Sequence, residues 1–221
     1  MSTDIIVSYD GTSNDDDAVA LAKMLAQGGA SLALAYVRHS KEFDPRREEL
    51  AAHDASRRLE AGAALLGAPD MPRHVVVSAS TGEGLERLAT AEGASVIVFG
   101  SDYRTPPGHA EPGNTAQHLL EGGPVAIAVA AAGLRTSAHA TIKSISVSSP
   151  DGHTAAGDTA TALAGRLGAE IVSSDNGPAD LIVVGSAGPV GRVALTGVTR
   201  SQLNRVRGSI LVVPSDKPVS L

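Results

Sequence analysis

Three places that follow apolar runs carry groups suited to holding a nucleotide. They are Asp10, Val37 and the pair Gly100 and Ser101. A carboxylate can accept hydrogen bonds from ribose hydroxyls or an adenine amino group, a main-chain edge can read a base, and glycines let N–H groups approach phosphates. If the apolar runs are strands of one open parallel sheet, their carboxyl ends meet at the edge where such sheets bind ligands. We therefore expect a nucleoside site there.

The segment after Gly100 has the parts of a phosphate-binding loop but an unusual composition. It is rich in glycine and proline and runs to Gly113, Asn114 and Thr115, where a helix-like segment begins. A strand, a glycine loop and a helix start are the parts of many phosphate sites. Its prolines have no N–H to offer a phosphate; they are Pro106, Pro107 and Pro112. The segment is therefore either a nucleotide loop or an altered form of one.

The other polar clusters have structural explanations. Asp15, Asp16 and Asp17 follow Asn14, which we expect to cap a helix, and acidic side chains in a first turn interact favourably with the helix dipole. We predict no metal site there. Arg104 is suited equally to holding an anion and to lying solvated in a loop.

No arrangement typical of an enzyme is present. The serines after the glycines have no placed base, no Walker lysine follows a glycine loop, and no carboxylate pair is set for acid–base chemistry. The chain has no cysteine, which excludes disulfides, thiolate catalysis and iron–sulfur clusters. We therefore do not predict an enzyme.

The charge and the apolar content of the sequence argue against two classes of partner, nucleic acids and membranes. A net charge of -6 and the lack of any run of five basic residues argue against nucleic acid as a partner. The longest apolar stretch, residues 124–134, is too short to span a bilayer, and the first residues do not resemble a signal peptide. We expect a cytoplasmic protein that does not bind membranes.

Strand-like runs alternate with helix-like segments in the first 132 residues, which is typical of parallel βαβ units. With right-handed crossovers, these form a doubly wound five-stranded sheet of the α/β class. The expected strands are residues 5–7, 31–38, 75–77, 96–99 and 125–129. We take residues 1–132 as the first domain.

The pattern then restarts, which indicates an internal repeat. Residues 180–186 parallel residues 95–101 at an offset of 85, and the same offset relates residues 208–210 to 123–125. The second copy is shorter, with room for about four strands. We predict a linker at residues 133–140 and a second, truncated domain at residues 141–221.

The chain resembles the universal stress protein family in its tandem form. The resemblance rests on "IIVSYDGTSNDDDAVALA", on "SVIVFGS…GN…GGPVAIAV" and on "DLIVVGSAG…GVT…GSILVV". It implies a fold like that of the adenine-nucleotide alpha-hydrolases. Gly100 and Gly113 are 13 residues apart, which fits the spacing of the ATP-binding members, and Asn114 replaces their Ser or Thr. Tyr103 replaces a second glycine, so we expect its side chain to occupy phosphate space.

The second copy keeps a different part of this motif. Gly185, Ser186 and Gly188 match its strand-end half, whereas Gly197 is one residue too close and is followed by valine. Asp151 corresponds to Asp10. The resemblance makes these five positions a weaker second set of candidates.

The resemblance implies a stress-response regulatory protein that binds ATP or AMP in its first domain, with no metal beyond the Mg²⁺ that accompanies the nucleotide. It also implies that the final strands of the two copies pair within the chain as a pseudo-dimer, and that the chain forms a homodimer. Two alternatives remain open. One is a dimerisation or scaffold module that has lost nucleotide affinity, and the other is a weak ATPase.

Overall fold

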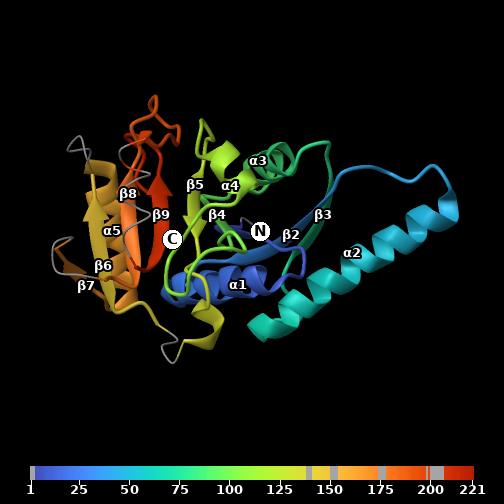
Figure 1. Cartoon of the computed structure of the whole chain (residues 1–221), viewed down its shortest axis with the longest axis horizontal. Helices are drawn as coiled ribbons and strands as arrows, with labels where there is room; N and C mark the ends of the chain where they lie inside the picture. The colour runs from blue at the N-terminus through green and yellow to red at the C-terminus, as the bar shows by residue number, and fades with distance from the viewer. Residues whose placement is uncertain (1–2, 138–140, 150–153, 174–177, 198, 200–206) are drawn as a thin grey trace.

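A computed structural model describes residues 3–137, 141–149, 154–173, 178–197, 199 and 207–221 (Figure 1). Its strands form one nine-stranded sheet in the order β3-β2-β1-β4-β5-β9-β8-β6-β7. All neighbouring strands are parallel except β5 and β9. The strands are β1 (Ile5–Ser8), β2 (Leu32–Arg38), β3 (Arg73–Val77), β4 (Val96–Phe99), β5 (Ala126–Val129), β6 (Ser144–Ser148), β7 (Glu170–Val172), β8 (Leu181–Gly185) and β9 (Ser209–Val213).

Helices cover both faces of the first five strands, which confirms the doubly wound α/β class. On one face lie α1 (Ser13–Leu25) and α2 (Pro45–Leu66), and on the other lie α3 (Thr81–Glu92) and α4 (Asn114–Leu119) (Figure 1). Two short 3-10 turns, η1 (Ala26–Gly28) and η2 (Leu134–Thr136), follow α1 and β5. Strands buried on both faces explain the continuous Val, Ile and Ala runs of β1, β4 and β5.

The second repeat adds four strands and the helix α5 (Thr154–Leu167) to the same sheet. Ile127, Ala128 and Val129 of β5 pair with Val212, Leu211 and Ile210 of β9. The final strands of the two repeats therefore pair within one chain, as expected. Since one buried cluster contains side chains of both repeats, the division at residues 132 and 141 stays a prediction, and residues 138–140 of the expected linker lie outside the described part.

The start of α1 differs from the expectation. Its N-cap is Thr12 and not Asn14: the Thr12 side chain accepts from the Asp15 N–H while the Asp15 carboxylate accepts from the Thr12 N–H. This reciprocal pair is a capping box. The Asn14 side chain instead donates to the carbonyl oxygen of Ser101 at 2.8 Å, which ties the helix to the loop after β4.

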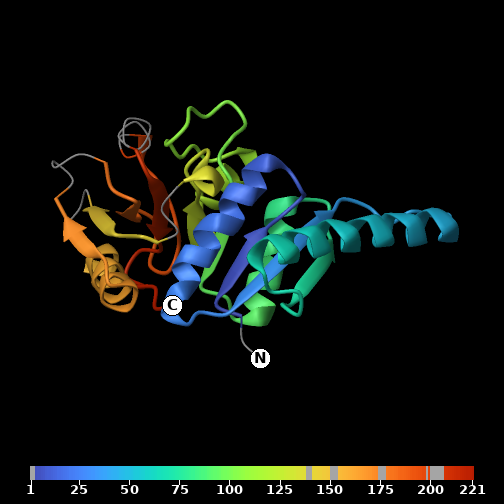
Figure 2. The same cartoon turned by 90° about the horizontal axis from the view of Figure 1, so that it is seen from below.

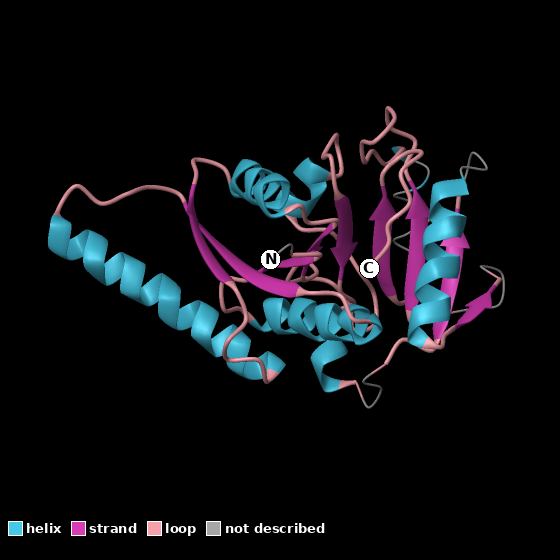
Figure 3. Cartoon of the chain, turned by 180° about the vertical axis from the view of Figure 1, so that it is seen from behind, coloured by secondary structure: helices cyan, strands magenta, loops and turns pink. Residues whose placement is uncertain are grey.

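Helix α2 extends well beyond the sheet. Its buried residues begin at Ala55, in the middle of the helix, and continue to Leu66, and the part before them projects from the body of the molecule (Figures 2 and 3). Asp44 caps it, and Gly67 ends it in a left-handed conformation. Among the described helices, none is long and apolar enough to cross a membrane.

Candidate functional site

A cavity of about 350 Å³ opens at the carboxyl ends of β1, β2 and β4. Six of the seven candidates from the first repeat line it, namely Asp10, Val37, Gly100, Gly113, Asn114 and Thr115. The other lining residues are Ser8, Tyr9, Asp15, Ala35, Tyr36, His39, Arg58, Thr81, Phe99 and Ala116. Because β1 lies between β2 and β4 in the sheet, Asp10 stands between Val37 on one side and Gly100 on the other.

The main chain of Val37 extends past the end of the neighbouring strand. The β1–β2 ladder ends at the pair Ser8 and Ala35, after which the Tyr9 N–H donates to the Ala35 carbonyl at 2.9 Å. Alternate residues of a strand direct their N–H and C=O groups to the same side. Val37 therefore directs its N–H and C=O toward the side of β1, beyond the point where β1 can pair with them.

Aromatic side chains are concentrated at this cavity. The chain has three tyrosines and two phenylalanines, and Tyr9, Tyr36 and Phe99 all line it. Burial, followed by Asp16, raises the pKa of Tyr9 to about 12, and its hydroxyl donates to Asp16 at 3.2 Å. Flat apolar rings beside a free main-chain edge provide the two kinds of contact that a nucleobase makes, stacking and edge pairing.

Two carboxyl groups, those of Asp10 and Asp15, share the centre of the site. One oxygen of Asp15 accepts from the N–H groups of Asp10 and Thr12 at 3.2 and 2.9 Å, and from the Thr12 hydroxyl at 2.8 Å. Burial, followed by the hydrogen bond to Asp10, raises the pKa of Asp15 to about 7. The raised pKa favours the protonated form of Asp15 at pH values where an isolated aspartate is ionised.

Arg58 of α2 closes the outer side of the cavity, and no local sequence pattern points to this residue. Its Nη1 donates to the Asp10 carbonyl at 2.9 Å, its Nε pairs with Asp54 at 2.9 Å, and its guanidinium lies 5.4 Å from the centre of the Tyr36 ring. The i,i+4 spacing of Asp54 and Arg58 predicts only an ion pair on the surface of one helix. Their place beside Asp10 depends on how α2 crosses the sheet.

The two glycines of the motif have different structural reasons. A β-carbon on Gly100 would overlap the main chain of Asn14, so Gly100 allows the first turn of α1 to approach β4. At Gly113 a β-carbon would meet nothing within 4 Å, and its φ of -69° is open to any residue. Gly113 is therefore the glycine that the fold does not require.

Ser101, the seventh candidate, does not line the cavity. It is buried, and its hydroxyl donates to the Ala130 carbonyl at 2.6 Å and accepts from the Glu111 N–H at 3.1 Å. The Ser101 hydroxyl thereby connects both ends of the loop from 101 to 112 to Ala130, the residue that follows β5. The side chain of Ser101 is committed to the loop itself.

Tyr103 does not fill the cavity, contrary to the expectation. Its side chain is 73% exposed and its ring lies 4.9 Å from the guanidinium carbon of Arg104. The loop turns at Asp102, which accepts from the Arg104 N–H and donates its own N–H to Glu111. That turn directs Tyr103 to solvent and away from the lining residues.

The second repeat uses its matching residues to close a turn. The Ser186 hydroxyl accepts from Ala194 N–H at 2.6 Å and from Gly188 N–H at 3.0 Å. A β-carbon on Gly188 would lie 3.0 Å from that of Ala194. Gly185 ends β8, Gly197 has open space around its α-carbon, and Asp151 lies outside the described residues. In the described part of the chain, none of these positions lines the first cavity.

The side chains of the three consecutive aspartates, Asp15, Asp16 and Asp17, make different contacts. Asp15 faces the cavity and Asp16 accepts from Tyr9. Asp17 is buried and accepts from the N–H groups of Gly133 and Arg135, each at 2.8 Å, and from the Arg135 guanidinium at 2.9 Å. Nowhere in the described ranges do three potential metal ligands of the His, Asp or Glu type gather.

Comparison with known proteins identifies the fold. The model of the universal stress protein family matches residues 1–131. A universal stress protein from Archaeoglobus fulgidus superposes with a TM-score of 0.68 at 14% identity, over 97% of this chain and 99% of that chain. A functionally unknown protein from Pseudomonas aeruginosa gives 0.62 at 15% identity, over 97% and 93%. At these identities the structures show the shared fold alone. A search of curated proteins found no match.

Proposed function

Because the chain belongs to the universal stress protein family, we propose that it is a stress-response regulatory protein whose cavity between β1, β2 and β4 binds an adenine nucleotide, ATP or AMP. The observation that carries the proposal is the main-chain edge of Val37 toward β1, which has no hydrogen-bond partner in the described part of the chain and lies beside Asp10. An N–H and a C=O in one strand edge complement the acceptor and donor on the pairing edge of adenine.

The order of the strands supports an orientation for the nucleotide. The base would lie at β2, against Val37 and the rings of Tyr36 and Tyr9, with the ribose at Asp10 on β1. The phosphates would then lie toward Gly100 and Gly113 at β4. Gly113 has space for them because a β-carbon there meets no neighbour within 4 Å. Mg²⁺ would enter only with the nucleotide.

The charged side chains of the site affect the relative affinities for nucleotides with one and with three phosphates. Asp10 and Asp15 are acidic, and Arg58 and His39 are the basic side chains among the lining residues. Arg58 already pairs with Asp54 and with the Asp10 carbonyl. Since few positive groups are available for a triphosphate, a monophosphate incurs less repulsion, and we propose that AMP binds at least as tightly as ATP.

Isothermal titration calorimetry with ATP, ADP and AMP tests the proposal. We expect saturable binding at a single site, lost in Gly113→Trp because an indole would fill the cavity, and weakened in Asp10→Ala. The matched control is Gly197→Trp, at the corresponding glycine of the second repeat, where a β-carbon also meets nothing within 4 Å. Equal loss in both tryptophan variants, or no saturable heat with any of the three nucleotides, would contradict the proposal.

A second function, a dimerisation or scaffold module that binds no nucleotide, is favoured by one observation. Two oxygens of Asp10 already have partners in the protein: Oδ1 accepts from the Thr12 N–H at 3.2 Å, and the main-chain carbonyl accepts from Arg58. In that case the titrations give no binding, while the pairing of β5 with β9, which does not involve the cavity, remains intact.

A further inference from the structure

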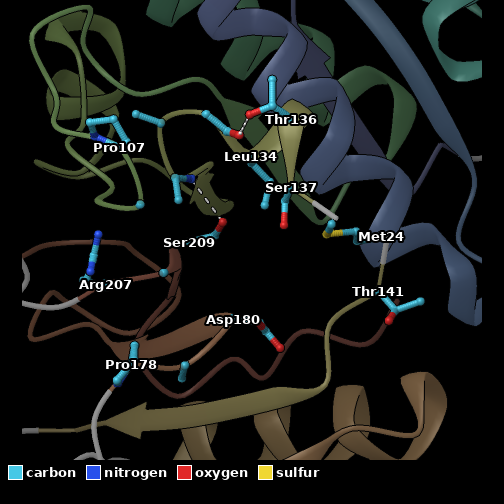
Figure 4. Close-up of a pocket in the computed structure, with 16 residues that line it drawn as sticks. Met24, Pro107, Leu134, Thr136, Ser137, Thr141, Pro178, Asp180, Arg207 and Ser209 are labelled. Atoms are coloured by element: carbon cyan, nitrogen blue, oxygen red, sulfur yellow. Dashed lines mark hydrogen bonds between the residues drawn. The ribbon is translucent and has the colours of Figure 1, made fainter. Parts of the chain in front are cut away.

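A second cavity, of about 530 Å³, lies where the two repeats meet (Figure 4). It is placed at the carboxyl end of β5 and the amino ends of β9 and β8, and it shares no lining residue with the first cavity. Its lining residues are Met24, Pro107, Gly108, Ala131, Ala132, Gly133, Leu134, Thr136, Ser137, Thr141, Pro178, Ala179, Asp180, Arg207, Gly208 and Ser209.

Hydrogen bonds that cross between the repeats fix its walls. The Gly208 N–H donates to the Gly108 carbonyl at 2.8 Å, and the Ala131 N–H donates to the buried Ser209 hydroxyl at 3.1 Å. Gly208 has a φ of 132°, and a β-carbon there would overlap the Ala179 carbonyl. Walls held in this way are formed before any ligand binds, which reduces the ordering cost of binding.

Two opposite charges line the cavity with unused hydrogen-bonding capacity. The Oδ2 atom of Asp180 accepts from the N–H groups of Lys143 and Ser144, at 2.8 and 3.0 Å, and from the Ser144 hydroxyl. Its Oδ1 atom has no partner among the described residues. Arg207 is exposed beside Gly108 and has no acidic partner within the described part of the chain. A cationic group can therefore pair with Asp180 and an anionic group with Arg207.

Between these charges the walls are largely apolar. They are formed by Met24 from the end of α1, Leu134 from η2, Pro107, Pro178 and Ala131. Figure 4 shows Met24, Leu134, Pro107 and Pro178 around the space that Asp180 and Ser209 line. A molecule with only one charge would leave either Oδ1 of Asp180 or the guanidinium of Arg207 without a ligand partner, whereas a zwitterion with apolar side chains would satisfy both. The volume lies in the range of pockets that hold small organic ligands.

We propose that this junction cavity binds a zwitterionic, apolar compound of about the size of a dipeptide, with its ammonium at Asp180 and its carboxylate at Arg207. The proposal explains why the loop from 101 to 112 is rich in proline. Pro107 and Gly108 form a wall of the junction cavity, while the far end of the same loop reaches Gly113 at the first cavity. Proline has no N–H for a phosphate, but it provides a rigid apolar wall.

Calorimetric titration of the full chain with the dipeptide leucyl-leucine tests the assignment. We expect saturable binding, and a loss of at least about tenfold, the value of one charge-assisted hydrogen bond, with either N-acetyl-leucyl-leucine or leucyl-leucine amide. Asp180→Asn should weaken leucyl-leucine but not the acetylated form, which has no ammonium to lose. Arg207→Gln should weaken leucyl-leucine but not the amide, which has no carboxylate.

Arg207→Gln carries the test if Asp180→Asn fails to fold, because Arg207 is exposed whereas Asp180 also holds the start of β6. Arg47→Gln, an exposed arginine on the projecting half of α2, is the matched control and should bind as the wild type does. The proposal is overturned if leucyl-leucine shows no saturable binding up to about 5 mM, if both blocked forms bind as tightly, or if Arg207→Gln weakens all three compounds equally.

Discussion

The main-chain carbonyl of Asn14 lies directly against the α-carbon of Gly100, so that a β-carbon at position 100 would overlap it. This contact joins the first turn of α1 to the end of β4. The Asn14 side chain strengthens the junction, because it donates to the Ser101 carbonyl at 2.8 Å. Gly100 therefore serves the packing of helix on sheet, whatever ligand lies beside it.

We predict that Gly100→Ala destabilises the protein by about 3 kcal/mol, since the added methyl overpacks a junction that must shift to accept it. Gly113→Ala should change stability by no more than about 0.5 kcal/mol, because its β-carbon would stand in open space. Urea unfolding followed by circular dichroism measures both. Similar losses for the two alanines would show that the contact with Asn14 is not what requires glycine at position 100.

The buried carboxylate of Asp17 connects α1 to the segment after β5. It accepts two main-chain N–H groups, from Gly133 and Arg135, and pairs with the Arg135 guanidinium. Asp17→Ala leaves those N–H groups without their acceptor, and we predict a loss of about 2–3 kcal/mol. Asp158→Ala, at an exposed position of α5, is the control. Chemical denaturation that placed the two variants within error of each other would refute this role for Asp17.

The outward direction of Tyr103 leads to a prediction about nucleotide affinity. Because its ring is exposed and stacks with Arg104, Tyr103→Gly should change the dissociation constant for AMP by less than about twofold. Gly113→Trp, titrated in parallel, shows the loss that a side chain inside the cavity produces. A marked gain in affinity for Tyr103→Gly would mean that the ring enters the cavity in solution.

The sequence predicted the inner half of the candidate site because topology places it. Asp10 and Gly100 follow apolar runs and Val37 lies near the end of one, and in a parallel sheet the carboxyl ends of neighbouring strands share one edge. The internal repeat predicted the strands of the second copy, and the resemblance to the family implied the pairing of β5 with β9. None of these steps required knowledge of how the helices pack.

The outer half could not be predicted, because it depends on packing over long sequence distances. Arg58 reaches Asp10 from 48 residues away, and only the angle of α2 across the sheet brings it there. The N-cap was misassigned for a related reason. Thr12 and Asn14 are both good capping residues, and the contact of Asn14 with Ser101 across 87 residues decides between them. The turn at Asp102 likewise decides the direction of Tyr103.

The raised pKa of Asp15 leads to a prediction about stability and pH. Burial and Asp10 raise this pKa from 3.8 to about 7, so the folded state retains a proton that the unfolded state has released between these values. The stabilisation is complete below pH 3.8 and is lost as the pH rises through about 7.

Asp15→Asn imitates the protonated carboxyl at every pH, because its amide can still accept from Thr12 and donate to Asp10. We therefore expect the free energy of unfolding of the wild type, measured relative to Asp15→Asn in urea titrations from pH 5 to 8, to fall as pH rises. Parallel pH profiles for the two proteins would show that Asp15 does not retain a proton in the folded state over this pH range.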